Sequence, residues 1–223
     1  MQKSSDLPAG FYDENCRACP RLVDFLDRTR AAHPDYHARP VAPFGDPHAR
    51  LLIVGLAPGM HGANRTGRPF TGDYAGILLY RTLHRFGFAS RGQSISRDDD
   101  LTLFDCRITN TVKCLPPQNK PELAEVKRCN RYLRDEIAGL SPDSAILALG
   151  GIAHRAVLLA MDIKASLCPF AHGAIHRPGG RPTLFDSYHC SRYNTQTRRL
   201  TDTMFEAVFE RIVKHLNAID RLS

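Results

Sequence analysis

One stretch of the sequence, residues 51–76, constrains the fold more than any other part of the chain. It opens with an uninterrupted apolar run, residues 51–54, of the kind that forms a strand buried on both faces of a parallel sheet. Gly55 and Gly59 follow, and glycine lets a backbone turn sharply and approach a ligand closely. In open α/β sheets, ligands bind just beyond the carboxyl ends of the strands. We therefore expect the polar loop after this strand to form one wall of a binding site.

Strand and helix patterns alternate along the whole chain. Apolar or alternating runs predict strands at residues 51–54, 104–112, 144–149 and 183–188. Amphipathic or capped segments predict helices at residues 17–30, from 74, at 121–137, from 150, and at 204–216. This alternation implies a three-layer α/β/α sandwich with a central, mainly parallel four-stranded sheet. The 223 residues fit a single domain, and the polar residues 1–14 are expected to form a loose N-terminal arm.

Composition and charge narrow the function classes. No apolar run approaches the length of a membrane span, and the first residues lack the apolar core of a signal peptide. We therefore expect a cytoplasmic protein with no membrane partner. The formal net charge of +7 suits a polyanionic partner. Seven cysteines in such a protein point to metal binding or catalysis rather than to disulfides.

Four of the cysteines form the candidate metal site. Cys16 and Cys19 are a close pair, whereas Cys114 and Cys129 are widely spaced. A structural zinc site more often uses two close pairs, and a redox pair would follow a strand, which this pair does not. Four thiolates with one close pair can hold a [4Fe–4S] cluster. We therefore rank an iron–sulfur cluster above zinc.

Two long segments carry a family resemblance. GLAPGMHGANRTGRPFTGD, at residues 55–73, resembles the first motif of the uracil-DNA glycosylase superfamily, in the form of its family 5 (the UDGb type). SYHCSRYNTQT, at residues 187–197, resembles the second motif, although Cys190 stands where family 5 normally has proline. The four candidate cysteines also resemble the cluster ligands of family 4 and family 5. The resemblance implies a monofunctional glycosylase that carries a [4Fe–4S] cluster, and we expect the protein to be a monomer. Its expected substrates are uracil, hypoxanthine and xanthine in double-stranded DNA.

The resemblance assigns roles to residues that would otherwise be read as structural. Glycosylases flip the target base out of the duplex, and Phe70 would stack on that base. Asn110 would read the base edge, because its amide offers one acceptor and one donor. His189 would donate a hydrogen bond to the base O2 as negative charge develops there. The full set of expected base-binding residues is Gly55, Ala57, Gly59, Phe70 and Asn110.

The first motif of this sequence lacks the carboxylate that usually orients the attacking water. In ordinary uracil glycosylases the first motif reads GQDPY and its Asp serves the water, but the aligned residue here is Ala57, as in family 5. Asp73 is the nearest carboxylate and is expected to orient the water, with Asn64 as the second candidate. Asp73 also suits the N-cap of the following helix. Gly59 aligns with the Tyr of GQDPY, so the pocket is expected to be wide enough for purines.

DNA contacts are expected from both motifs. The segment after His189 is expected to be a loop that enters the duplex, with Tyr193 as the wedge. The other expected contacts with DNA are Arg65, Arg68, Arg192, Asn194 and Gln196. Two alternatives stay open: a non-catalytic binder of damaged or single-stranded DNA, in which Ala57 marks lost activity, and an iron–sulfur electron carrier.

Overall fold

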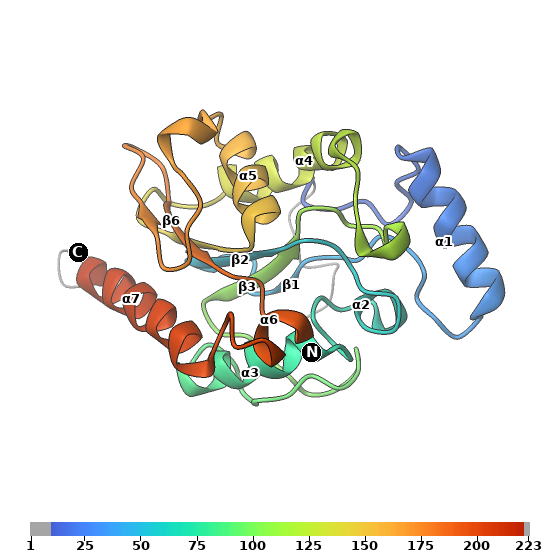
Figure 1. Ribbon diagram of the computed structural model, residues 1–223, viewed down its shortest axis with the longest axis horizontal. Helices are drawn as coiled ribbons and strands as arrows, with labels where there is room; N and C mark the ends of the chain where they lie inside the picture. The colour runs from blue at the N-terminus through green and yellow to red at the C-terminus, as the bar shows by residue number, and fades with distance from the viewer. Residues whose placement is uncertain (1–9, 221–223) are drawn as a thin grey trace.

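The fold is built around one six-stranded sheet. The structure, a computed structural model, describes residues 10–220. The strand order is β1-β3-β2-β4-β6-β5 (Figure 1). Its four central strands pair in parallel and all their residues are buried: β2 (Leu51–Gly55), β3 (Cys106–Asn110), β4 (Ala145–Leu149) and β6 (Thr183–Ser187). These are the four predicted strands. The continuous apolar runs of β2 and β4 account for their burial on both faces, whereas β3 and β6 also bury polar residues such as Arg107 and Asp186.

The predicted number of four strands is nevertheless wrong. The two-residue strands β1 (Phe44–Gly45) and β5 (Ile175–His176) pair antiparallel with β3 and β6 at the two edges. Two residues carry no periodicity that a sequence pattern could reveal. These strands exist because the edges of the parallel sheet offer unpaired backbone groups to passing loops.

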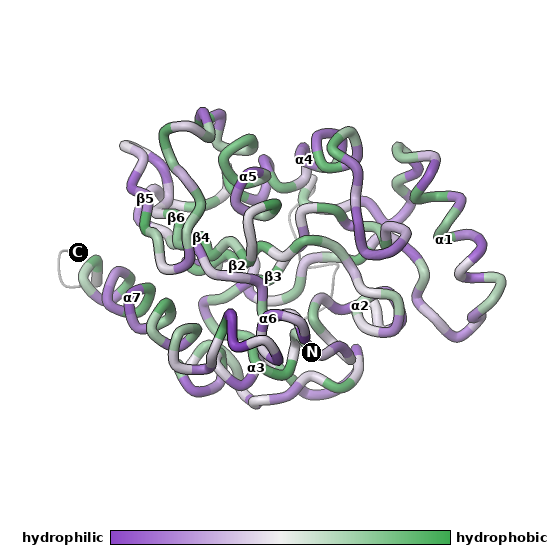
Figure 2. Tube along the Cα trace, in the orientation of Figure 1, coloured by the Kyte–Doolittle hydropathy of each residue, from purple (hydrophilic) through white to green (hydrophobic). Residues whose placement is uncertain are grey.

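Helices cover both faces of the sheet, which confirms the three-layer architecture (Figure 1). On one face, α3 (Tyr74–Arg85) and α7 (Asp202–Asp220) share a core with strand residues such as Ile53. On the other face, α1 (Pro20–Ala32), α4 (Leu123–Ala138) and α5 (Gly151–Ala160) share a core with Leu52 and its equivalents. Figure 2 shows the alternation of apolar and polar residues along α7 that this single-sided packing requires. None of the helices in the described range is long and apolar enough to cross a membrane.

Short helical elements follow three of the strands: α2 (Ala63–Thr66) follows β2, η2 (Pro117–Asn119) follows β3, and α6 (Arg192–Gln196) follows β6. A further short element, η3 (Ala165–Leu167), follows α5. Helix α6 replaces the loop predicted after His189. Ser191 makes the difference, because its hydroxyl accepts a hydrogen bond of 3.4 Å from the Asn194 N–H and caps the helix.

The structure describes residues 10–14 of the predicted loose arm over residues 1–14, and for these residues the prediction is wrong. Residues 1–9 lie outside the described residues. Phe11 is buried, with the Arg107 guanidinium 4.8 Å from its ring centroid. The Tyr12 hydroxyl donates to the Pro40 carbonyl at 2.8 Å. These two aromatic side chains fasten the end of the described chain to the body of the protein.

Candidate active site

A pocket opens at the carboxyl ends of the central strands, and both sequence motifs line it. Ala57, Gly59 and Asp73 come from the segment after β2, Asn110 ends β3, and His189 follows β6. The ends of parallel strands meet at one edge of the sheet, so residues far apart in sequence converge there.

Phe70 occupies a position that two glycines make possible. Its backbone is left-handed, with φ of 55°, and the residue is buried. A Cβ at Gly55 would lie 2.7 Å from the Phe70 ring, and a Cβ at Gly76 would lie 1.8 Å from the Phe70 carbonyl oxygen. The ring faces His189, with 6.0 Å between centroids and 28° between planes. A strained conformation held so tightly beside a pocket is typical of functional residues.

Asn110 presents an unpaired amide oxygen in the wall of the pocket. The residue is 3 % exposed, and its side-chain oxygen has no hydrogen-bond partner among the described residues. It lies opposite Gly55 in the parallel pairing of β2 and β3. A buried acceptor without a partner is rare, and here it lies in the wall of a cavity. It is therefore available to a donor on a bound ligand.

His189 is held as a neutral imidazole. Burial lowers its pKa from 6.5 to about 4. The Asn194 side-chain N–H donates to the His189 carbonyl at 2.8 Å, a positioning contact that the sequence did not indicate. Cys190, in the place of the usual proline, is fully buried in the core on the α3 and α7 face. The backbone on the C-terminal side of His189 is therefore anchored without proline.

Asp73 serves as a helix cap and also faces the pocket. Its Oδ1 accepts the Gly76 N–H at 2.9 Å at the start of α3. Burial raises its pKa, partly offset by the hydrogen bonds from the backbone of Gly76 and Ala75. Asn64, the second candidate for the water, is fully buried, and Ala63 rather than Asn64 lines the pocket. Both polar atoms of its side chain lack partners in the described residues.

The predicted DNA contacts divide into exposed and buried residues. Arg68 is 4 % exposed, forms an ion pair with Asp99, and lies 4.3 Å from the Phe44 ring centroid. It cannot reach a phosphate, so its predicted contact with DNA is wrong. The loop that contains Asp99 folds over it, which the sequence did not reveal. The other arginines and polar residues are exposed at the surface: Arg65, Arg192, Tyr193 (70 % exposed) and Gln196.

Comparison with known proteins agrees with this geometry. The family model described as "Uracil DNA glycosylase superfamily" matches residues 42–213. The chain belongs to the uracil-DNA glycosylase superfamily. It is 50 % identical over 197 residues to a "Type-5 uracil-DNA glycosylase" of Thermus thermophilus, covering 85 % of this chain and 89 % of that one. A protein of the same name from Pyrobaculum aerophilum is 40 % identical over 212 residues (90 % and 92 %).

Relatives of lower identity show to which branch of the superfamily the chain belongs. A "Type-4 uracil-DNA glycosylase" of Thermotoga maritima is 31 % identical over 191 residues, covering 84 % of each chain. Because the type-5 relatives are clearly more similar, the chain is a member of the type-5 branch, as the two motifs predicted.

In this type-5 glycosylase, the four candidate cysteines line one cavity between α1, the segment after β3 and α4: Cys16, Cys19, Cys114 and Cys129. Every cysteine in the described chain is a free thiol. The Lys113 backbone N–H donates to Cys129 Sγ at 3.4 Å, and Arg131 donates to Cys16 Sγ at 3.6 Å. Burial raises the pKa of the Cys114 and Cys129 thiols, so they stay protonated unless a bound metal displaces the protons. Four sulfurs surrounded by donors and cations fit an anionic iron–sulfur cluster.

A buried charge network lies beside the cysteine cavity and links β3 to α4. Lys113 Nζ lies 2.7 Å from Glu136 Oε1, which also accepts the Thr109 hydroxyl at 2.8 Å. Arg107 Nε lies 3.4 Å from the other Glu136 oxygen. The network therefore ties β3, whose last residue is Asn110, to α4, which carries Cys129. Sequence reasoning missed it, because no local pattern pairs these residues.

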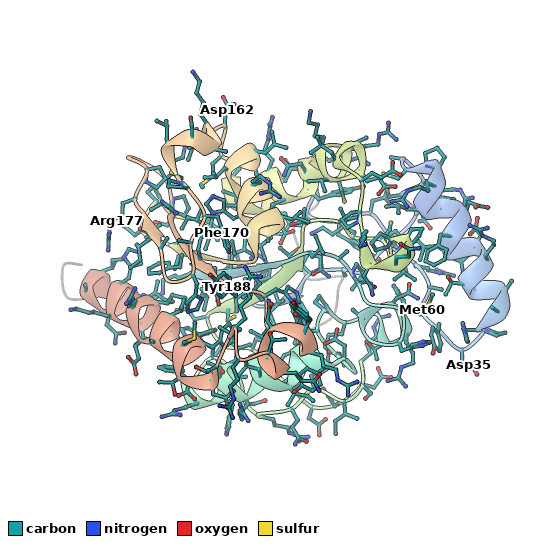
Figure 3. All side chains as sticks on the ribbon, viewed as in Figure 1. Asp35, Met60, Asp162, Phe170, Arg177 and Tyr188 are labelled. Carbon is teal, nitrogen blue, oxygen red and sulfur yellow. The ribbon has the colours of Figure 1, made fainter. Side chains whose placement is uncertain are left out.

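A second buried cluster lies under the other motif. His154 Nδ1 and His176 Nε2 contact the two Asp186 oxygens at 2.8 and 3.0 Å, and His154 Nε2 donates to the Cys168 carbonyl at 2.8 Å. These distances are those of hydrogen bonds, and the three side chains also lie close enough together to hold a metal ion. The His154 ring packs on Phe170, and Phe170 packs on Tyr188, the residue before His189. Figure 3 labels Phe170 and Tyr188.

Proposed function

We propose that this protein is a DNA-repair glycosylase that removes uracil, hypoxanthine and xanthine from double-stranded DNA and leaves an abasic site. One observation carries the proposal: Phe70, Asn110, Asp73 and His189 meet around a single pocket. Each of these residues alone has a structural explanation. Their convergence in a member of this superfamily favours catalysis over binding alone.

Asn110 supplies a physical basis for selecting deaminated bases. Its unpaired amide oxygen can accept a hydrogen bond from a ring N–H of the flipped base. Uracil and hypoxanthine carry such an N–H where cytosine and adenine present an acceptor. An acceptor facing an acceptor leaves both unpaired in a buried site, which costs about 1–3 kcal/mol. Phe70 offers its ring as the stacking surface for the same base.

His189 stabilises the leaving base. As the N-glycosidic bond breaks, electrons move onto the base and its O2 becomes negative. A neutral imidazole N–H can donate to that oxygen without transferring its proton, and the lowered pKa keeps His189 neutral at physiological pH. A preorganised donor in a buried site acts as an oxyanion hole does.

Asp73 activates the water. The burial that raises the pKa of its carboxyl also strengthens it as a proton acceptor. Its negative charge also stabilises the positive charge that develops on the sugar. Asp73→Asn keeps the helix cap but removes the charge, so DNA binding should persist while base release slows. Wild-type single-turnover rates for this variant would leave Asp73 with its capping role alone.

Gly59 gives the pocket the width that purines need. A Cβ there would meet no described atom within 4 Å. Where the GQDPY form of the motif has a tyrosine side chain, this chain leaves open space. The net charge of +7 and the exposed Arg65 and Arg192 suit a duplex partner, on which we propose that the protein acts as a monomer.

We also propose that Cys16, Cys19, Cys114 and Cys129 hold a [4Fe–4S] cluster with a structural role, since hydrolysis needs no electrons. A bound cluster would cross-link α1, α4 and the segment after Asn110. Cys129→Ser should lose the brown colour, the bound iron and much of the solubility. Cys168→Ser, a buried cysteine outside the cavity, is the matched control and should keep all three. A colourless, fully active wild-type protein would contradict the cluster.

The direct test is base release from otherwise identical duplexes that contain uracil, hypoxanthine, xanthine or only normal bases. We expect release of uracil and of at least one deaminated purine, and none of normal bases. A protein that binds these duplexes but frees no base would instead be the non-catalytic binder that Ala57 left open. Reversible reduction without affinity for DNA would identify an electron carrier.

A further inference from the structure

Three polar side chains that line neither the pocket nor the cysteine cavity meet in the interior, between α5 and one edge of the sheet. They are His154 on α5, His176 on β5 and Asp186 on β6. One nitrogen or oxygen atom of each lies within 4.8 Å of those of the other two. Asp186 is fully buried, and only 13 % of the His176 side chain is exposed. The fold therefore gathers two imidazoles and a carboxylate at one point that water hardly reaches.

The atoms that face one another in this cluster are all possible metal ligands. His154 Nδ1 lies 2.8 Å from one oxygen of Asp186, and His176 Nε2 lies 3.0 Å from the other. A nitrogen and a carboxylate oxygen attract each other at this distance only if a positive centre lies between them. In the absence of a metal, that centre is a proton in each contact. A divalent cation among the three groups would replace both protons, as metal binding generally displaces protons from its ligands.

The far side of the His154 ring supplies an independent indication. His154 Nε2 lies 2.8 Å from the Cys168 carbonyl oxygen, which can only accept, so Nε2 must carry a proton. A neutral His154 therefore turns the lone pair of Nδ1 toward the Asp186 carboxylate. Histidines that bind metals almost always donate their other ring N–H to a carbonyl or carboxylate, which fixes the tautomer and the ring. The Cys168 carbonyl gives His154 this support.

We propose that His154, His176 and Asp186 form a structural zinc site that is separate from the four cysteines of the candidate cluster. Imidazole nitrogens suit zinc, whereas magnesium and calcium prefer sites made of oxygen alone. The second oxygen of Asp186 offers a fourth donor atom. The ion would tie α5 to β6 and to the two-residue edge strand β5, beneath the segment that carries His189. The inference goes beyond the proposed function and does not depend on it.

The first test is metal analysis of the protein purified without a polyhistidine tag and incubated with Zn²⁺, with the excess removed. We expect about one tightly held zinc ion per chain in addition to any iron. X-ray absorption at the zinc edge should show nitrogen and oxygen ligands at about 2.0–2.2 Å, because zinc held by the cysteines would show sulfur at about 2.3 Å. Cys129→Ser should lose the iron and keep this zinc.

The second test compares His176→Gln with His48→Gln. A glutamine amide nitrogen can still donate to Asp186, but it does not bind zinc, so His176→Gln keeps the hydrogen bond and loses a ligand. We expect its zinc affinity, measured by calorimetry, to fall about tenfold or more. His48 is exposed and lies outside the cluster, so His48→Gln should bind zinc as the wild type does. Zn²⁺ added to chelator-treated protein should raise the unfolding temperature of the wild type but not that of His176→Gln.

Three results would overturn the proposal. Wild-type protein that retains no zinc would leave a hydrogen-bonded cluster in which His154 carries a second proton. Zinc with sulfur ligands alone would place the ion at the cysteines. Equal zinc affinity of His176→Gln and wild type would exclude His176 as a ligand. If His176→Gln does not fold, the zinc content and the absorption spectrum of the wild type decide the question. A failure to release any base would refute the proposed function and leave these measurements unaffected.

Discussion

Gly55→Ala tests the geometry of the pocket with a single methyl group. In the wild-type structure a Cβ at position 55 would lie 2.5 Å from Asn110 Oδ1 and 2.7 Å from two carbons of the Phe70 ring. Ordinary contacts begin at 3.4 Å, so the two side chains must give way by roughly 1 Å. Phe70 has little room to move, because its left-handed backbone packs against Gly76.

The methyl group should therefore damage catalysis far more than folding. Overpacking of this kind costs about 1–3 kcal/mol in the free energy of unfolding. A displacement of about 1 Å in a positioned group costs roughly 10² in rate. Single-turnover release of uracil should fall by about that factor, while affinity for duplex DNA stays near wild type, because the exposed DNA-facing residues are untouched.

Gly179→Ala is the matched control. Gly179 lies far from the pocket in sequence, and a Cβ there would meet no described atom within 4 Å. It should match the wild-type protein in both stability and rate. If Gly55→Ala also released uracil at the wild-type rate, the close packing of Phe70 and Asn110 over Gly55 would not matter for the reaction, and the proposed roles of both side chains would fall.

Three further predictions concern the pocket and its support. His189→Ala should lower the rate by about 10² to 10³, and the contribution of His189 to the pH dependence of the unfolding free energy should vanish. The pKa of His189 falls from 6.5 to about 4 on folding, so the folded state binds fewer protons between these values. Wild-type unfolding free energy should therefore drop by up to about 3 kcal/mol as pH falls through this window, relative to the variant. Gly59→Tyr should suppress release of hypoxanthine more than release of uracil; equal suppression would contradict the wide pocket. Glu136→Gln should lower the free energy of unfolding, measured by chemical denaturation, by about 3–5 kcal/mol, because it leaves two buried cations without a counter-charge. Asp24→Asn, which removes one partner of an exposed ion pair, should change that free energy little.

The sequence by itself determined the architecture and the place of the site. Continuous apolar runs identified β2 and β4, because a strand buried on both faces of a parallel sheet is mostly apolar, and the less regular patterns at residues 104–112 and 183–188 identified β3 and β6. The polar residues that follow β2, β3 and β6 then had to meet, since parallel strands end at one edge. The two motifs and the cysteine set identified the family, which the comparisons confirm.

Other features depend on contacts that no local pattern encodes, and only the tertiary structure decided them. Arg68 and Arg65 lie three residues apart in one motif, yet Arg68 is buried on Asp99 and Arg65 is exposed, because a distant loop covers one and not the other. Asn119 also lines the pocket, although no sequence pattern indicated it. Its position depends on a turn in which Gln118 and Asn119 both have left-handed backbone angles. Glu136, likewise, balances charges on a strand far from it in sequence. Burial and backbone strain are set by the neighbours that the folded chain brings together, so the sequence could name the reacting groups but not the side chains that position them.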